Sequence, residues 1–319
     1  MAFKRFFVGV IGIAFFIVGI LYPSLFFLQL GLRRSNAQYI QNWFVYKEKY
    51  AHSIKEHKII VISGSNSLFS IQAGEIEKQL EIPTVNYGVH AGLGLKYLLH
   101  RSKKIINEGD VVLLPLEYQM YQDDEPFGGE YNTFISSFDP YYFTNNSLLY
   151  KLKFIYSMKF SDIKNGILDE YRHKKRVAAY DNLSLNKNGD IIGNTVEKSD
   201  RLKIKEGALG FSKNESYPTK DAKAILDDFL DYCQKKNCAI FVSFPAYYVS
   251  TRGFKSNDLR AIQEITDYWD SQEDVTLLST YSDNLYDIDD FYDGNYHMND
   301  RGRNKRTKQI ICKLKPILK

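Results

Sequence analysis

The chain begins with an uncharged, apolar stretch, Phe6–Leu32, which is 27 residues long in a sequence of 319. Fully helical, this stretch would be about 40 Å long, against a hydrocarbon core of roughly 30 Å. A cleaved signal peptide is the alternative, but the apolar region is too long and no small-residue cleavage site follows closely. We therefore predict an uncleaved single-pass anchor over residues 1–32. Pro23 should kink this helix or mark where it leaves the bilayer.

The charges of the chain almost cancel, with 42 Lys and Arg against 38 Asp and Glu, for a net charge of +4. Binding driven by charge alone is excluded, and we expect no nucleic-acid partner. The orientation of the anchor is hardly decided by charge, because Lys4 and Arg5 on one side face Arg33 and Arg34 on the other. The three cysteines form no metal-ligand pattern. We expect neither a metal nor a cofactor.

Beyond the anchor, residues 33–57 are predicted to form a juxtamembrane linker helix, and residues 58–319 one α/β domain. The strand at 59–62 is β-branched throughout and the strand at 111–116 is nearly continuously apolar, which is typical of a parallel sheet covered on both faces, and segments with helical periodicity lie between the strands. The strands are predicted at 59–62, 82–88, 111–116, 239–244 and 275–278, and the helices at 67–80, 90–107, 219–236, 256–270 and 299–318.

An insertion at about residues 118–218 breaks this alternation and is rich in aromatic residues. These side chains would either line a carbohydrate cleft or pack a small helical subdomain. They are Tyr141, Tyr142, Phe143, Tyr150, Phe154 and Tyr156. A basic cluster at 172–176 is expected to be a solvated helix face.

The first strand ends at Gly64 and is followed by Ser65, Asn66 and Ser67. A serine in a turn between a strand and a helix lies beside unpaired backbone N–H groups, which suits a nucleophile with an oxyanion site. The alternative is that these residues only cap the helix, since serine and asparagine are preferred there.

A second polar loop, 289–301, lies between the last strand and the closing helix and contains Asp293 and His297. In an open parallel sheet this loop and the Ser65 turn should emerge at the same edge. Serine chemistry needs a base and a carboxylate that orients it, and this loop supplies both. The two segments together favour an enzyme.

These motifs resemble blocks I, II and V of the SGNH/GDSL hydrolase superfamily. More closely, the chain is similar to membrane-anchored SGNH-like proteins of bacterial envelope polysaccharide loci, distantly akin to D-alanine transfer and alginate O-acetylation proteins. The resemblance covers about residues 58–117 and 239–318 and implies a flavodoxin-like, three-layer α/β/α fold. The motifs are Gly64-Ser65-Asn66, Asn86-Tyr87-Gly88, and Asp293 with His297.

The resemblance implies that Ser65 is the nucleophile, His297 the base and Asp293 the residue that orients it. Backbone N–H groups of Ser65 and Gly88 would form part of the oxyanion hole. Ser67 is the rival nucleophile and Asp290 the rival acid.

Two departures from the family pattern concern the remaining site residues. The usual Asp-x-x-His is stretched by one residue here. The third block normally presents an asparagine, but the matching strand end reads Leu116-Glu117-Tyr118. Asn66 or Asn86 is the candidate for the missing oxyanion donor.

The resemblance further implies acyl transfer, such as O-acetylation, onto an envelope or exported polysaccharide through an acyl-serine intermediate. The domain would be extracytoplasmic at the cell membrane, and a separate multi-pass membrane protein would deliver the acyl group. A carbohydrate esterase or deacylase of the same fold is one alternative. The other is a non-catalytic, membrane-anchored glycan-binding or assembly protein, which the third-block departure and the aromatic insertion favour.

Overall fold

The structure is a computed structural model that describes residues 2–122, 125–171, 184–204, 209–249 and 253–319. The chain divides into two compact units. A helical unit comprises residues 1–41 and 127–179, and an α/β unit comprises residues 42–126 and 180–319. The predicted basic cluster at 172–176 lies outside the described residues.

The α/β unit is built on a five-stranded sheet in which every pairing is parallel. The strand order, β2-β1-β3-β6-β8, is a doubly wound order. β2 is added on one side of β1, and the later strands β3, β6 and β8 are added on the other side. β1 and β3 are buried throughout, as their continuous apolar sequence predicts, and β2 is buried although it contains Thr84 and Asn86. The predicted parallel α/β sheet is confirmed. Its strands are β1 (Ile59–Val61), β2 (Thr84–Asn86), β3 (Val111–Leu114), β6 (Ala239–Val242) and β8 (Val275–Leu277).

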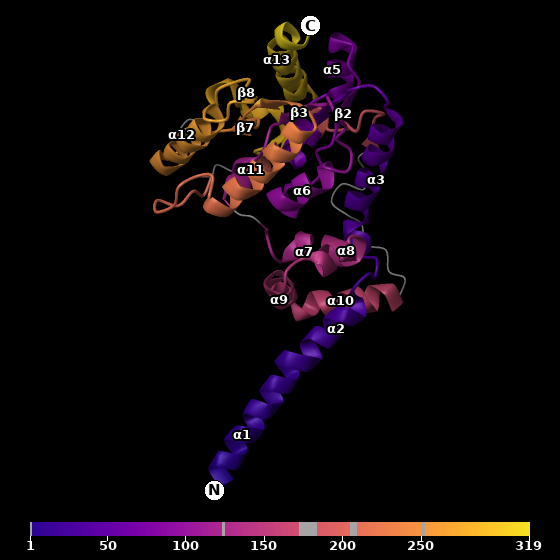
Figure 1. Ribbon diagram of the computed structural model, residues 1–319, viewed down its shortest axis with the longest axis vertical. Helices are drawn as coiled ribbons and strands as arrows, with labels where there is room; N and C mark the ends of the chain where they lie inside the picture. Colours follow the sequence, from indigo (N-terminus) through magenta and orange to yellow (C-terminus); the bar gives the residue numbers. More distant parts are fainter. Residues whose placement is uncertain (1, 123–124, 172–183, 205–208, 250–252) are drawn as a thin grey trace. The chain divides into compact units, whose positions relative to one another are not determined.

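Helices lie on both sides of this sheet (Figure 1). Apolar side chains of α5 and α13 join Ile59 and Val61 of β1 in one buried cluster. α6 and α11 lie on the other side of the strands (Figure 1). The helices of this unit are α3 (Gln38–Ser53, which starts in the helical unit), α4 (Ser65–Ser70), α5 (Ala73–Leu80), α6 (Gly94–Ser102), α11 (Lys220–Lys235), α12 (Ser256–Asp270) and α13 (Asp300–Leu318).

The helix predicted at 67–80 is two helices, because the chain is extended at Ile71 and Gln72. Asp190 makes this break possible. Its carboxylate accepts hydrogen bonds from the N–H groups of Ala73 and Gly74, at 2.8 and 3.1 Å, where α5 begins. A carboxylate at this position satisfies the unpaired donors of a helix start.

Three two-stranded pairings complete the unit. They are β4 (Ser184–Leu185) with β5 (Ile191–Ile192), β7 (Tyr247–Tyr248) with β9 (Leu285–Tyr286), and β10 (Phe291–Gly294) with β11 (His297–Met298). Short 3₁₀ turns are η3 (Ala91–Leu93), η4 (Tyr118–Tyr121), η5 (Val196–Lys198), η6 (Arg201–Lys203), η7 (Ser282–Asn284) and η8 (Ile288–Asp290). The β10–β11 hairpin positions the polar loop predicted between the last strand and the closing helix.

The helical unit contains one helix, Phe3–Gln29, that is long and apolar enough to cross a membrane. It does not stop at Pro23; a π-helical turn precedes the proline, which lacks an N–H to donate. It comprises α1 (Ala2–Phe15), η1 (Phe16–Leu21) and α2 (Tyr22–Gln29), and the unit adds η2 (Ser35–Ala37), α7 (Gly129–Phe138), α8 (Pro140–Asn145), α9 (Leu148–Ser157) and α10 (Phe160–Tyr171).

Most of the aromatic residues predicted in the insertion pack this helical unit. Phe26 of α2 is fully buried, with ring centroids 5.1 Å from Phe143 and 5.8 Å from Phe154. Tyr141 and Tyr156 are the exposed members of the set. The C-terminal end of α2 is therefore part of the core of the helical unit.

The predicted linker and insertion are each divided between the units. The division at residues 41 and 42 falls inside α3, and Phe44 and Lys47 beyond it are completely buried. Residues 127–179 of the insertion belong to the helical unit, and the remainder belongs to the α/β unit.

Candidate active site

The Ser65 turn lies at the carboxyl edge of the sheet, where β1 ends and α4 begins. Gly64 makes this turn possible by close packing. A Cβ atom at Gly64 would lie 2.5 Å from the Cα atom of Ala91, which is backbone and cannot move aside as a side chain can. Only glycine therefore lets the two segments approach this closely.

Ser65, His297 and Asp293 form a hydrogen-bonded chain at this edge. His297 Nε2 lies 2.9 Å from Ser65 Oγ, and His297 Nδ1 lies 2.7 Å from Asp293 Oδ1. The imidazole stacks on Phe69 of α4, with centroids 4.2 Å apart and planes inclined by 14°. The His297 and Asp293 side chains are 18% and 13% exposed. The imidazole is thus held on one face by Phe69 and is partly exposed to solvent.

The stretched Asp-x-x-x-His spacing follows from the β10–β11 hairpin. Asp293 lies in β10 and His297 begins β11, with Gly294 paired opposite His297. The extra residue is taken up by the hairpin turn, and the two side chains still meet.

The rival nucleophile and the rival acid have other partners. Ser67 is completely buried, and its hydroxyl donates to the Gly64 carbonyl oxygen at 3.3 Å. Asp290 is also buried and forms ion pairs with Arg301 and Lys305, each at 2.9 Å. The structure brings Ser65 and Asp293 to the histidine; the catalytic roles themselves stay a prediction.

Asn86 and Gly88 at the end of β2 support the turn. The Asn86 side-chain amide donates to the carbonyl oxygens of Ser67 and Ile71, at 2.9 and 3.2 Å, and to Asp190. The Gly88 N–H donates to Asn86 Oδ1 at 3.1 Å. A Cβ atom at Gly88 would lie 1.9 Å from Ser67 Oγ. In this arrangement Asn86 holds α4 in place through its side-chain amide, and its side-chain oxygen accepts the Gly88 N–H predicted to face the oxyanion.

Asn66 connects the turn to two other loops at the same edge. Its side-chain amide donates to the carbonyl oxygens of Ala246, at 3.0 Å, and Tyr296, at 3.4 Å. Its side-chain oxygen accepts a hydrogen bond from Ser70. The donors of both candidate asparagines therefore already have protein acceptors. Their role as oxyanion donors stays a prediction that would need these bonds to open.

Sequence reasoning did not assign a role to Glu117, which the structure places under the turn. This carboxylate is completely buried and accepts hydrogen bonds from the N–H groups of Gly64, at 3.0 Å, and Asn66, at 2.7 Å. It also lies 2.7 Å from Ser63 Oγ. Ser65 lies between these two donors in the sequence, and no acceptor among the described residues forms a hydrogen bond with its N–H. The strand-end position of Glu117, where the resemblance expects an asparagine, was the available signal.

A buried cation, Lys47 of α3, lies beneath Gly88. Its Nζ atom donates to the Gly88 carbonyl oxygen at 2.5 Å, and the side chain is completely buried. Burial lowers the pKa of Lys47 to about 7, and the nearby Asp190 carboxylate opposes part of that shift. The sequence did not single out this lysine, which lies in the segment predicted to be a linker.

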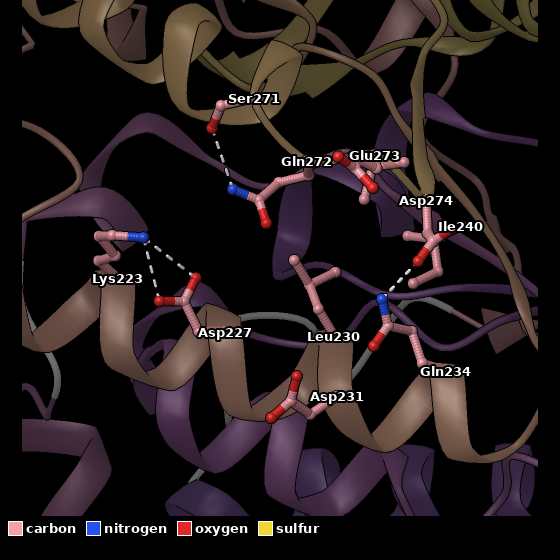
Figure 2. A pocket seen from close by; sticks show the side chains of 11 residues that line it. Lys223, Asp227, Leu230, Asp231, Gln234, Ile240, Ser271, Gln272, Glu273 and Asp274 are labelled. Carbon is pink, nitrogen blue, oxygen red and sulfur yellow. Dashed lines mark hydrogen bonds and ion pairs between the residues drawn. The ribbon is translucent and has the colours of Figure 1, made fainter.

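A pocket of about 410 Å³ lies away from these residues, between α11 and the segment leading into β8 (Figure 2). Ile240 and Val275 in its wall lie at the amino ends of β6 and β8. In a parallel sheet this edge is opposite the Ser65 turn. Four of the eleven residues that line the pocket are acidic, but the part of the chain that the structure describes holds no group of three or more potential metal ligands.

Comparison with known proteins gives no family assignment. No protein-family profile matches the chain, and no curated protein is significantly similar to it. The SGNH resemblance therefore stays a prediction.

Proposed function

We propose that this chain is a membrane-anchored, serine-dependent acyltransferase of the SGNH type that acts on an envelope or exported polysaccharide. The observation that carries the proposal is the chain of contacts from Ser65 Oγ to His297 Nε2 and from His297 Nδ1 to Asp293. Serine nucleophiles are activated by such an arrangement on unrelated folds. The parallel sheet with both segments at its carboxyl edge is the setting expected for an SGNH fold.

In the first half-reaction, Ser65 Oγ attacks the carbonyl carbon of the acyl donor while His297 Nε2 takes the hydroxyl proton. Asp293 accepts the Nδ1–H bond and stabilises the imidazolium that forms. The tetrahedral oxyanion is stabilised by the Ser65 N–H, and by the Gly88 N–H if this donor is shared with Asn86. Collapse expels the leaving group, which takes the proton from His297, and leaves acyl-Ser65.

In the second half-reaction, His297 removes a proton from the acceptor hydroxyl, whose oxygen attacks the acyl carbon. The bond from the acyl carbon to Ser65 Oγ then breaks, and Oγ takes the proton back from His297 Nε2. A sugar hydroxyl as acceptor makes the protein an O-acyltransferase, whereas water makes it a carbohydrate esterase. The apolar helix Phe3–Gln29 favours transfer, because an anchored enzyme stays beside a membrane protein that delivers the acyl group. We propose an extracytoplasmic domain; topology mapping that placed residues 33–319 in the cytoplasm would contradict this.

The decisive experiment is labelling of the full chain in detergent with a fluorophosphonate, followed by peptide mass analysis. The full chain is needed because Phe26 belongs to the core of the helical unit. Wild type, Ser65→Ala and Ser67→Ala are compared. Labelling lost only in Ser65→Ala supports the proposal, and labelling on Ser67 would mean that the nucleophile is wrong. Release of acetate from an activated ester, with and without an oligosaccharide, then separates esterase from transferase.

The second candidate is a non-catalytic glycan-binding or assembly protein of the same fold. Glu117 favours it, because this carboxylate occupies two backbone donors of the turn where the family resemblance expects a further oxyanion donor. Folded wild-type protein that takes up no fluorophosphonate would favour this candidate over the enzyme.

A further inference from the structure

The helical unit exposes an apolar face on α9, next to the spanning helix. α9 begins at Ser147, whose hydroxyl accepts a hydrogen bond from the N–H of Tyr150. Its inner face is buried through Tyr150, Phe154 and Ile155. On its outer face, Leu148 is 73% exposed, Leu149 63% and Leu152 43%. Three exposed leucines within five residues form an unusual patch for a water-facing helix.

Contacts within the helical unit fix the end of α9 to the spanning helix. The Tyr156 hydroxyl donates to the Val18 carbonyl oxygen at 3.0 Å, and the Tyr22 hydroxyl donates to the Met158 carbonyl oxygen. The rings of Tyr22 and Tyr156 stack with centroids 5.9 Å apart. α9 is seen nearly end-on in Figure 1, whereas α1 and α2 run along the picture, so α9 crosses the direction of the spanning helix.

The depth of this contact follows from helix length. A hydrocarbon core of roughly 30 Å corresponds to about 20 helical residues, which from Phe6 reach to Leu25. Val18 and Tyr22 lie about 10 Å and about 5 Å before that limit at 1.5 Å per residue, so the end of α9 is attached just inside the boundary between acyl chains and headgroups. Tyrosine is enriched at this level, because its ring is apolar and its hydroxyl is polar.

We propose that α9 lies in the membrane interface, with Leu148, Leu149 and Leu152 inserted at the boundary between headgroups and acyl chains. The lipid bilayer is the occupant of this face because the face continues directly from the spanning helix. Lys153 and Lys159 are exposed beside it, and their long side chains reach the phosphate groups while their stems stay apolar. The chain is then held by a span and an interfacial helix together, whatever chemistry Ser65 performs.

The test places a tryptophan on this face of the full chain and reconstitutes it in vesicles of phosphatidylcholine and phosphatidylglycerol. Leu149→Trp and Leu152→Trp are made separately, so that one failure to fold does not end the test. Leu202→Trp is the control, since Leu202 is a 94% exposed leucine of the α/β unit. Native Trp43 and Trp269 are buried and give the background, which is subtracted using wild type.

We expect lipids brominated near the headgroup to quench the added tryptophan on α9 more than lipids brominated at the chain end. Iodide in the water should quench the Leu202→Trp control at least threefold more strongly than either α9 variant. Iodide quenching of the α9 variants equal to the control would overturn the proposal. Protection from both iodide and bromine would also overturn it, because a protein partner or a second copy would then cover the face. Failure of the chain to float with the vesicles would refute the anchor itself.

Discussion

Glu117 gives the sharpest test of how the nucleophile turn is held. Its two carboxylate oxygens accept the N–H groups of Gly64 and Asn66, on either side of Ser65. Glu117→Gln keeps the shape of the side chain but turns one acceptor oxygen into an amide donor. A glutamine can therefore accept only one of the two N–H bonds, and the other donor is left buried and unpaired.

The loss in free energy of unfolding follows from the number of buried N–H donors that lose their acceptor. A buried N–H without a partner costs roughly 1–3 kcal/mol. For a unit of this size, this corresponds to a fall in melting temperature of roughly 2–12 °C. Glu117→Ala leaves both donors unpaired and a cavity besides, so its fall should be larger than that of Glu117→Gln.

Two measurements on the full chain in detergent separate stability from activity. Tryptophan fluorescence follows melting of the α/β unit, because both Trp43 and Trp269 lie in it. The rate of fluorophosphonate labelling at a temperature where both proteins are folded reports the placement of Ser65. We expect both the melting temperature and the labelling rate to fall in Glu117→Gln.

The control is Glu273→Gln, which makes the same change at an exposed residue and should melt like wild type. Equal melting temperatures for Glu117→Gln and this control would refute the inference that Glu117 holds the turn. A lower melting temperature with an unchanged labelling rate would show that the carboxylate supports the fold but does not position Ser65.

Three further predictions follow from the same site. Asp293→Asn should lower the labelling rate by about 10²–10⁴-fold. Asp290→Asn should keep the wild-type labelling rate but lower the melting temperature, because Asp290 is a buried ion-pair partner. Equal labelling rates in the two variants would contradict the assignment of Asp293 as the acid. Because burial lowers the pKa of Lys47 to about 7, the unfolded chain binds more protons than the folded chain above that pH, so this lysine should raise stability from pH 7 to 9.5. Lys47→Met should remove this rise in stability with pH. If the melting temperatures of variant and wild type changed equally from pH 7 to 9.5, the prediction would be wrong. Gly64→Ala should abolish labelling and lower the melting temperature, and Ala91→Gly should not restore either, because the clash also involves the Ala91 Cα and N atoms; full rescue would show that only the methyl group of Ala91 stands in the way.

The candidate site was predictable to the extent that its residues lie at the ends of recognisable elements. Ser65 follows a continuously apolar strand, and Asp293 and His297 precede an amphipathic helix, so each could be identified from its own neighbourhood. The preference for Ser65 over Ser67 and for Asp293 over Asp290 rested on motif register. The contacts of His297 now give that preference a geometric basis.

Supporting residues far away in the sequence could not be found in this way. Asp190 accepts a hydrogen bond from the N–H of Ala73 at the start of α5, although it lies in a hairpin 117 residues further along the chain. Lys47 reaches Gly88 from a helix that sequence reasoning treated as a linker. Neither residue carries a local pattern, because its partner is chosen by how the chain folds back on itself.

The sequence by itself determined the apolar helix, the alternation of strands and helices and the polar turns at one sheet edge, because periodicity and burial are set by neighbouring residues. Only the tertiary structure decided the strand order, the division of the insertion between two units and the buried partners of the Ser65 turn. The physical reason is that a buried donor or charge must find a partner somewhere in the folded chain. Its identity depends on distances in space that residue spacing does not encode.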